Sequence, residues 1–159
     1  MDANLFHDAL TGCSVTGILH IMNATPIDWY TKKQATVETA TYGSEFVAAR
    51  TCVKQIIDLR NTLRYLGVPV NERSYMFGDN ESVVNSASIL HAKLHKRHTA
   101  LSFHRVREAV ASKYVGFYFL PGTSNPADIL SKHWSYAVNW NLLQSLLFWQ
   151  GDTASIDNG

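Results

Sequence analysis

Apolar residues recur with two different periodicities along this chain, and together they predict a mixed α/β domain. The run from Cys13 to Met22 is rich in β-branched and apolar residues, which is typical of a strand. Residues 23–26 supply a turn, and residues 27–31 predict the next strand. With a short strand around Asp2, these segments predict an antiparallel meander of three strands.

Longer stretches carry apolar residues at helical spacing. The first helix is expected from Thr41, as its cap, to about Leu66, where Gly67 and Pro69 end it. Further helices are predicted at residues 82–90, 96–112, 126–132 (capped by Asn125) and 135–149. The last of these has a thin polar face, so we expect it to pack on the sheet or on a partner.

Two more strands are predicted at residues 75–79 and 115–120. The resulting order places helices between strands, which indicates an α/β domain whose mixed sheet is covered by helices. We expect a single domain at residues 1–150 and a short polar tail at residues 151–159. Trp29 and Trp140 are expected in the core rather than as platforms for base stacking.

Composition narrows the class of protein. The chain has 159 residues, of which 46% are hydrophobic and 17% charged, as expected for one globular core. The two cysteines, Cys13 and Cys52, lack a metal-ligand spacing, which favours a reduced intracellular protein. No run is long or apolar enough to span a bilayer, so we expect no membrane partner.

Candidate chemistry begins at Asp79, which ends a predicted strand and precedes a predicted helix. Strand ends are where an α/β sheet meets ligands, although Asp79 or Asn80 could equally serve only as a helix cap. Three further acids occupy comparable places: Asp2 on the first strand, and Glu45 and Asp128 at helix starts. Oxygen ligands from separate segments suit Mg²⁺, and two such ions could clamp a scissile phosphate.

A basic stripe runs from His91 to Arg107 and contains no acid. It fits phosphate contacts, although a solvated helix face would show the same pattern. A zinc site of its histidines is disfavoured, because no cysteine or acid accompanies them at a recognised spacing. The predicted nucleic-acid contacts are Asn80, Ser82, Lys32, Lys33, Lys96, Arg97, His98, His104 and Arg105.

Six segments in this order resemble the ribonuclease H domain of copia-type retrotransposon polyproteins, over nearly the whole chain. They are residues 2–4, 29–37, 44–48, 79–82, 95–108 and 126–132. The resemblance implies a five-stranded mixed sheet and a metal-dependent endoribonuclease that cleaves the RNA strand of RNA–DNA hybrids during reverse transcription. It also implies that Asp2, Glu45, Asp79 and Asp128 bind two Mg²⁺ ions, for which Mn²⁺ can substitute.

The same resemblance implies a reverse transcriptase domain preceding this one in a polyprotein. The protein would then be intracellular, either in cytoplasmic virus-like particles or in the nucleus.

Three features depart from the family pattern. Gly43 stands where a second acid is usual, so Glu45 alone is assigned there. Met1 stands where the body of the first strand is expected, which should remove ladder hydrogen bonds and loosen Asp2. The loop at residues 122–125 lacks a histidine found in cellular and retroviral relatives, so product release could be handled otherwise.

Two other readings of the sequence compete with the ribonuclease. A truncated or domesticated fragment would bind nucleic acid without cleaving it. A transposase or integrase core would share the sheet but use a glutamate on a late helix, and the positions of Glu45 and Asp128 argue against it.

Overall fold

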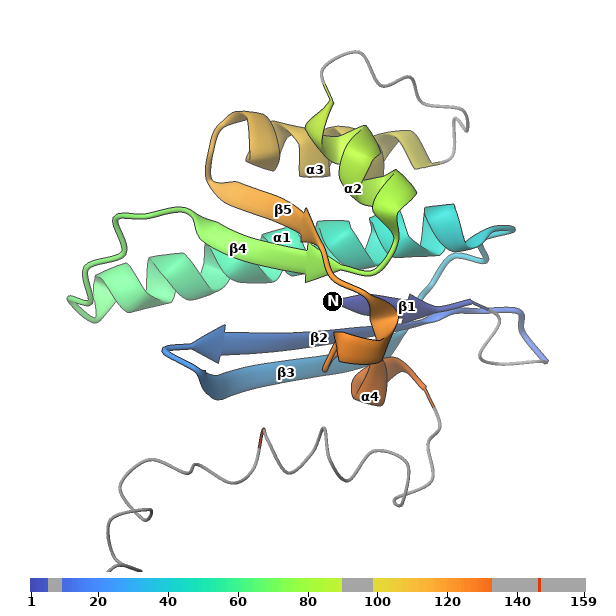
Figure 1. The fold of residues 1–159 in the computed structure, drawn as a ribbon, viewed down its shortest axis with the longest axis horizontal. Helices are drawn as coiled ribbons and strands as arrows, with labels where there is room; N and C mark the ends of the chain where they lie inside the picture. Colours follow the sequence, from blue (N-terminus) through green and yellow to red (C-terminus); the bar gives the residue numbers. More distant parts are fainter. Residues whose placement is uncertain (6–9, 90–98, 133–145, 147–159) are drawn as a thin grey trace, which may run out of the picture.

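The structure is a computed structural model that describes residues 1–5, 10–89, 99–132 and 146. Strands and helices alternate in the order expected of an α/β domain (Figure 1). The strands are β1 (Asp2–Asn4), β2 (Val15–Met22), β3 (Thr25–Lys33), β4 (Ser74–Gly78) and β5 (Val115–Phe119). The helices are α1 (Thr41–Tyr65), α2 (Glu81–Ser88), α3 (Ala100–Ala111), the 3₁₀ turn η2 (Gly122–Ser124) and α4 (Asp128–Ser131).

The five strands form two hydrogen-bonded groups. Strands β1, β2 and β3 make an antiparallel sheet in that order, whereas β4 and β5 pair in parallel. The terminal nitrogen of Met1 donates to the carbonyl of Phe77 at 2.8 Å, which ties the start of β1 to β4. The predicted α/β fold class, with antiparallel and parallel strands flanked by helices, is confirmed. The five strands predicted as one mixed sheet are hydrogen-bonded as a group of three and a pair.

The hairpin between β2 and β3 turns at Asn23 and Ala24, both with positive φ (50° and 63°). Two consecutive residues in this region are typical of the tight turn whose twist matches the flanking strands. The turn sets the register Gly17 opposite Thr31 and Leu19 opposite Trp29. On the other side of β2, Asp2 lies opposite Gly17.

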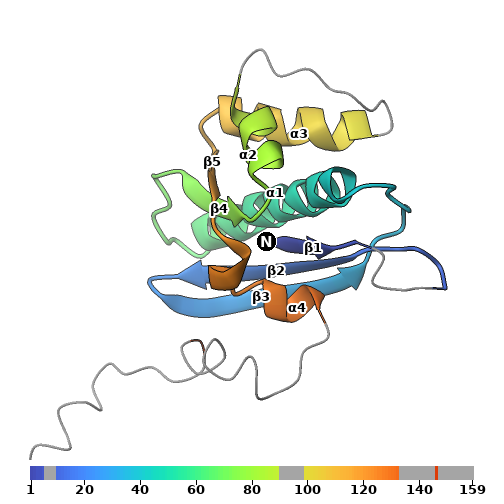
Figure 2. The same ribbon diagram turned by 45° about the vertical axis from the view of Figure 1, so that its right-hand side comes forward.

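Helices α1 and α3 cover one face of the strands and form the core with them (Figure 2). Phe46 of α1 and Phe103 of α3 are fully buried, with ring centroids 5.5 Å apart. Ile18 of β2 is buried on the same side, and His20 is hydrogen-bonded at 3.0 Å to Gln55 of α1. Burial of these side chains is the main stabilising term that holds α1, and therefore Glu45, against the sheet.

The far end of α1 is fixed to the segment that leads into β4. Arg60 is buried, and its guanidinium donates to the carbonyl oxygens of Glu72 and Val70 and to the hydroxyl of Ser74. The same group lies 4.6 Å from the centre of the Tyr114 ring. A guanidinium offers five donors in a fixed plane, so one residue can hold three acceptors and an aromatic face. The contact sets where β4 begins.

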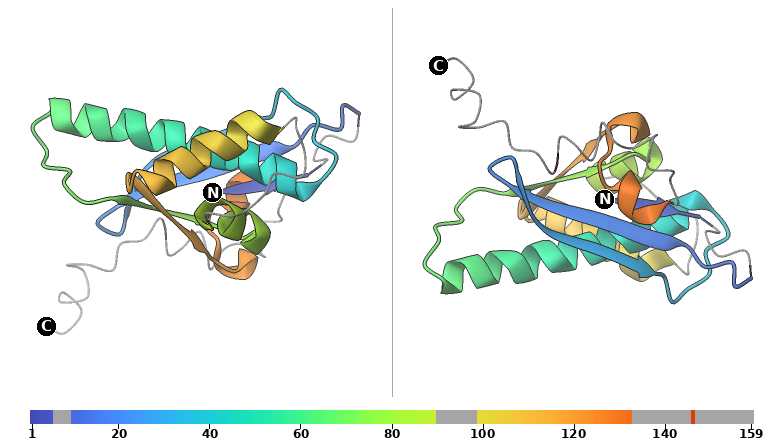
Figure 3. Two further views of the ribbon diagram at one scale, coloured as in Figure 1. Left: turned by 90° about the horizontal axis from the view of Figure 1, so that it is seen from above. Right: turned by 90° about the horizontal axis from the view of Figure 1, so that it is seen from below.

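Helix α4 lies on the face of β2 and β3 opposite α1 (Figure 3). Gly17 allows this approach, because a Cβ there would lie 2.6 Å from the carbonyl oxygen of Ala127 and 2.9 Å from the nitrogen of Ser131. Both atoms belong to backbone, which cannot rotate away as a side-chain end can. The hydroxyl of Thr31 donates to the carbonyl of Leu130 at 2.6 Å and fixes α4 to β3 as well.

Several boundaries and exposures differ from the sequence predictions. Trp29 was expected in the core but is 67% exposed. It lies opposite Leu19 on the face that α4 covers only near Gly17, so among the described residues no helix reaches it. Helix α1 is preceded by Ala40 at its cap, with Thr41 as its first residue. The predicted helix at residues 135–149, including Trp140, lies outside the described residues apart from Leu146.

We expect Gly17→Ala to lower the free energy of unfolding by about 1–3 kcal/mol, because the added methyl group must push the backbone of α4 away. Denaturant unfolding measures this loss. Gly67→Ala is the matched control: Gly67 has a φ of +79° and open space around its Cβ position, so that substitution strains only its own backbone. Because α4 carries Asp128, one of the acids predicted to bind metal, the rise in Tm on addition of Mn²⁺ should be smaller in Gly17→Ala than in the wild type. It should be unchanged in Gly67→Ala. Equal Mn²⁺ responses would contradict the role given to Gly17.

Candidate metal centre

Asp79 directly follows β4, and its neighbour Asn80 supplies the helix cap. The side chain of Asn80 accepts a hydrogen bond from the nitrogen of Val83 at 3.2 Å, which satisfies a free donor at the start of α2. The capping role that the sequence left open therefore belongs to Asn80. Asp79 is half-buried, and a Cβ at Gly122 of η2 would lie 3.1 Å from its Oδ2. The carboxylate of Asp79 is thus held between the end of β4 and the loop after β5.

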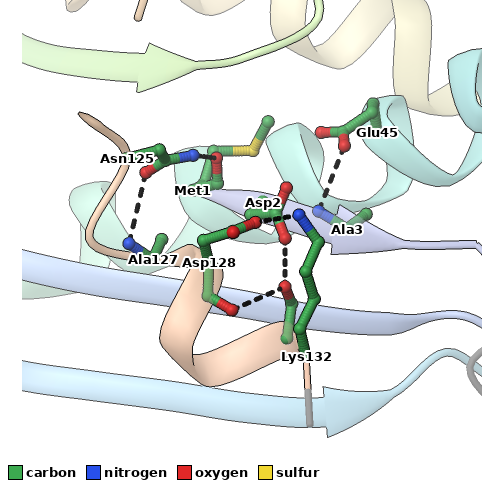
Figure 4. A network of polar contacts seen from close by, with 9 residues as sticks. Met1, Asp2, Ala3, Glu45, Asn125, Ala127, Asp128 and Lys132 are labelled. Carbon is green, nitrogen blue, oxygen red and sulfur yellow. Dashed lines mark hydrogen bonds and ion pairs between the residues drawn. The ribbon is translucent and has the colours of Figure 1, made fainter. Parts of the chain in front are cut away.

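Asp2 and Glu45 reach the same place from β1 and α1. Glu45 lies just beyond the first turn of α1, and its Oε1 accepts a hydrogen bond from the nitrogen of Ala3 at 3.1 Å (Figure 4). Asp2 and Glu45 are both buried. One carboxylate oxygen from each of Asp2, Glu45 and Asp79 lies within 4.8 Å of the other two. Three predicted site residues from distant segments therefore converge.

Asp128, the fourth predicted acid, opens α4 and adjoins this cluster through Asp2. The hydroxyl of Ser131 donates to Oδ2 of Asp2 and also contacts the carbonyl oxygen of Asp128 at 3.3 Å. The ammonium of Lys132 forms an ion pair with Oδ1 of Asp128 (Figure 4). Asp128 is buried, and this burial, together with the charge of Asp2, raises the pKa of its carboxyl.

Asn125 fixes the loop that delivers Asp128. Its side-chain nitrogen donates to the carbonyl of Met1 at 3.1 Å, and its side-chain oxygen accepts from the nitrogen of Ala127 at 3.2 Å. Asn125 is fully buried, so both amide groups are satisfied by backbone. The sequence predicted Asn125 as a helix cap, whereas the structure shows it capping the turn before α4 and joining that turn to β1.

Ser131 and Lys132 are site residues that sequence reasoning did not assign. They follow Asp128 by three and four residues, and side chains at these separations lie on one face of a helix. That spacing, within a segment already linked to the candidate acid, is the signal that could have found them. Their contacts place one hydroxyl and one ammonium among the four carboxylates.

Crowding shifts the ionisation of these groups. Burial, followed by the charges of Asp2 and Asp79, raises the pKa of Glu45 well above its ordinary value. Burial also raises the pKa of Asp2 and of Asp128, against the hydrogen bond from Ser131 and the ion pair with Lys132 respectively. Each shift has the same physical origin, because charged carboxylates lose hydration and repel one another.

The donor set fits a divalent cation. Carboxylate oxygens are the ligands that hard ions such as Mg²⁺ take. Among the residues that the structure describes, Oε2 of Glu45 is buried and has no hydrogen-bond partner. A buried acceptor without a partner is costly, and a cation would satisfy it and offset the repulsion. Asp2, Glu45 and Asp79 are the residues that would hold such an ion, with Asp128 beside them.

Among the described residues, those predicted to contact nucleic acid do not gather at one place as the acids do. Lys32 and Lys33 are exposed at the end of β3, and register places Lys32 opposite Thr16, which pairs with Ala3 next to Asp2. Two strand spacings separate Lys32 from β1, or about 10 Å. Ser82 is exposed in the first turn of α2, whereas Asn80 is engaged as the cap.

The basic stripe is described only in part. His104 and Arg105 are exposed on α3, and Arg105 forms an ion pair with Glu108 at 2.8 Å. Lys96, Arg97 and His98 lie outside the described residues, as do the other histidines once considered for zinc. The contacts predicted for these residues stay predictions.

The arrangement of strands and helices is that of a ribonuclease H-like fold. The structure is similar to that of LC11-RNase H1, isolated from compost by a metagenomic approach, with a TM-score of 0.61 and 14% sequence identity. The match covers 81% of this chain and 87% of that one.

In sequence, the chain is similar to a retrovirus-related Pol polyprotein from transposon TNT 1-94 of Nicotiana tabacum, with 29% identity over 134 residues. The aligned region is 82% of this chain and 10% of the polyprotein, so the chain spans about a tenth of that relative's length. No family model matches the chain. The two similarities confirm the resemblance to ribonuclease H domains of retrotransposon polyproteins that the sequence predicted.

We expect the metal-free protein to lose stability as the pH rises above 4.5, the ordinary pKa of Glu45. Below this pH the glutamate is protonated in both states. Above it the unfolded chain releases a proton that the folded chain retains, so unfolding is increasingly favoured until the raised folded pKa is passed. Thermal unfolding in chelator at a series of pH values measures the effect.

Glu45→Gln should flatten this dependence, because the amide does not ionise. Glu72→Gln is the matched control, since Glu72 is exposed and remote from the acidic cluster in the chain. If both variants keep the full pH slope, the burial penalty does not arise at Glu45.

Proposed function

We propose that this chain is a divalent-metal-dependent endoribonuclease that cleaves the RNA strand of RNA–DNA hybrids. The observation that carries the proposal is the convergence of Asp2, Glu45 and Asp79 within 4.8 Å, with Asp128 beside them. Such a cluster is costly to bury without cations and is suited to hold them. The ribonuclease H-like fold supports the same conclusion.

In this proposal, the four acids contribute to the reaction by binding and positioning divalent cations. When bound, divalent ions neutralise charge that builds on the scissile phosphate and activate water for attack. The chain's own part is preorganisation: the nitrogen of Ala3 orients Glu45, and the hydroxyl of Ser131 orients Asp2. No serine, cysteine or histidine is required as a nucleophile.

We assign substrate binding to exposed lysine and serine side chains near the acidic cluster. Lys32 and Lys33 lie on the edge strand β3, one and two rows along from the row of Asp2, where they could contact backbone phosphates. Contacts to 2′ hydroxyls would distinguish RNA from DNA, and the exposed Ser82 is one candidate for this role. Phosphate contacts give affinity without sequence preference, as a nuclease of this kind needs.

The setting proposed for this activity is the reverse transcription of a copia-type retrotransposon. The similarity to a Pol polyprotein supports a position within a polyprotein, which we place after a reverse transcriptase domain. Mg²⁺ is proposed as the natural ion, with Mn²⁺ as its substitute, because hard cations take carboxylate oxygens as ligands. Such a role would place the protein inside the cell, in cytoplasmic particles or in the nucleus. Among the described residues, no helix has the length and apolar character needed to cross a membrane.

Asp79→Asn should reduce Mg²⁺-dependent cleavage of the RNA strand by at least about a hundredfold, because the amide keeps the size of the carboxylate but loses its charge. The assay follows a labelled hybrid on a denaturing gel, with the DNA strand expected to stay intact. Asp58→Asn, at an exposed acid of α1, is the control and should cleave normally. Tight hybrid binding with no cleavage by the wild type would instead favour a binding-only fragment, and cleavage of duplex DNA alone would favour a transposase or integrase.

Lys32→Gln should weaken hybrid binding and lower the slope of log affinity against log salt concentration by about 0.9, the value for one lost phosphate contact. Fluorescence anisotropy in chelator, without turnover, measures both quantities. Lys54→Gln, at an exposed lysine of α1, should leave the slope unchanged. An unchanged slope in Lys32→Gln would show that Lys32 is simply solvated.

A further inference from the structure

The two sides of the acidic cluster, one formed by Asp2, Glu45 and Asp79 and the other by Asp128, differ in their contacts. On one side, oxygens of Asp2, Glu45 and Asp79 face one another, and Oε2 of Glu45 has no hydrogen-bond partner among the described residues. On the other side, Oδ1 of Asp128 is held by the ammonium of Lys132. An ammonium is therefore in direct contact with Asp128, whereas the terminal ammonium of Met1 is the weakest of the influences on the pKa of Glu45.

Lys132 is placed to act as a cation for the whole cluster. It follows the last residue of α4, and its side chain folds back by one turn to Asp128 (Figure 4). Burial lowers its pKa, but the ion pair with Asp128 and the charges of Asp2 and Asp79 outweigh burial and raise it. The side chain is 35% exposed against 9% for Asp128, so it also has a route out to solvent.

We propose that Lys132 is a tethered counter-ion that fills the second of two cation positions. The first divalent ion binds between Asp2, Glu45 and Asp79, and a second ion can bind beside Asp128 only when the ammonium withdraws. The inference rests on the proposed function for the assignment of the four acids as metal ligands. An ammonium and a divalent ion cannot share one carboxylate oxygen at contact distance without strong repulsion.

The chemistry of lysine suits this role better than that of arginine. Its ammonium is a compact, strongly hydrated charge on a flexible four-carbon stem, so it can leave one anion for another. A phosphate of the bound substrate is such an anion. Arrival of the substrate would draw Lys132 away from Asp128 and open the second position, so that the full ion set assembles only when there is a bond to cleave.

The test counts bound ions in the full chain without substrate. Mn²⁺ is titrated into metal-free protein, and free Mn²⁺ is followed by electron paramagnetic resonance. The wild type should bind one ion before a clearly weaker second. Lys132→Gln should bind the second at least about tenfold more tightly, the scale of effect that one neighbouring charge exerts on an ionisable group. Lys132→Arg, which keeps the charge, should bind the second ion no more tightly than the wild type, and the exposed-site control Lys54→Gln should behave as wild type.

The stability of the metal-free protein supplies an independent readout. Lys132→Gln should lower Tm in chelator, because the acids lose their cation, and should show a larger rise in Tm on addition of Mn²⁺ than the wild type. A lower Tm with unchanged ion number and affinity would overturn the proposal and leave Lys132 as a structural ion pair. Two ions of equal affinity in the wild type would also overturn it.

A measurement on the wild type covers the case in which Lys132→Gln does not fold. Amine labelling followed by mass spectrometry should show Lys132 becoming more reactive at the Mn²⁺ concentrations that fill the second position, while Lys54 stays constant. Unchanged labelling with two ions bound would contradict the withdrawal of Lys132. If the ions bind as expected but hybrid is not cleaved, the nuclease proposal fails and the inference about Lys132 stands.

Discussion

The burial of several carboxylates beside one another is the constraint on which the rest of this structure depends. Asp2, Glu45 and Asp128 are buried near one another, and loss of hydration raises the pKa of each. Folding therefore works against the charge it gathers, and the hydrophobic contact between the sheet and helices α1 and α3 must outweigh that cost. Burying these carboxylates lowers the free energy of unfolding of the metal-free protein, and the same arrangement is suited to hold cations.

Backbone groups and short polar side chains supply the restraint that ionic pairing cannot. Ala3 fixes Glu45, Ser131 fixes Asp2, and Asn125 joins the loop before α4 to Met1. Each contact links elements far apart in the sequence, so the acids come together only when β1, α1 and α4 are all in place. Asp2 and Glu45 are thus positioned by neutral groups, whereas Asp128 is paired with the ammonium of Lys132.

Sequence patterns predicted the order of elements and the fold class, because strand and helix periodicities are strong. The convergence of Asp2, Glu45 and Asp79 was predicted from the placing of acids at element ends together with the resemblance to ribonuclease H domains. The patterns did not predict the exposure of Trp29, which depends on how far α4 extends over β2 and β3. Nor did they assign Ser131, whose role arises from its contact with Asp2 of β1, or Lys132, whose ion pair with Asp128 matters because α4 lies beside the other acids. Features set by long-range packing leave little trace in a local pattern.

Gly17 illustrates how a site can be lost without any loss of its chemistry. The residue carries no functional group, yet the backbone of α4 rests directly on it, and α4 carries the fourth acid. A related chain could retain every carboxylate and still lose the arrangement of the site after the substitution Gly17→Ala on β2. Comparing the sites of related chains therefore requires inspection of the residue at position 17 as well as of the acids themselves.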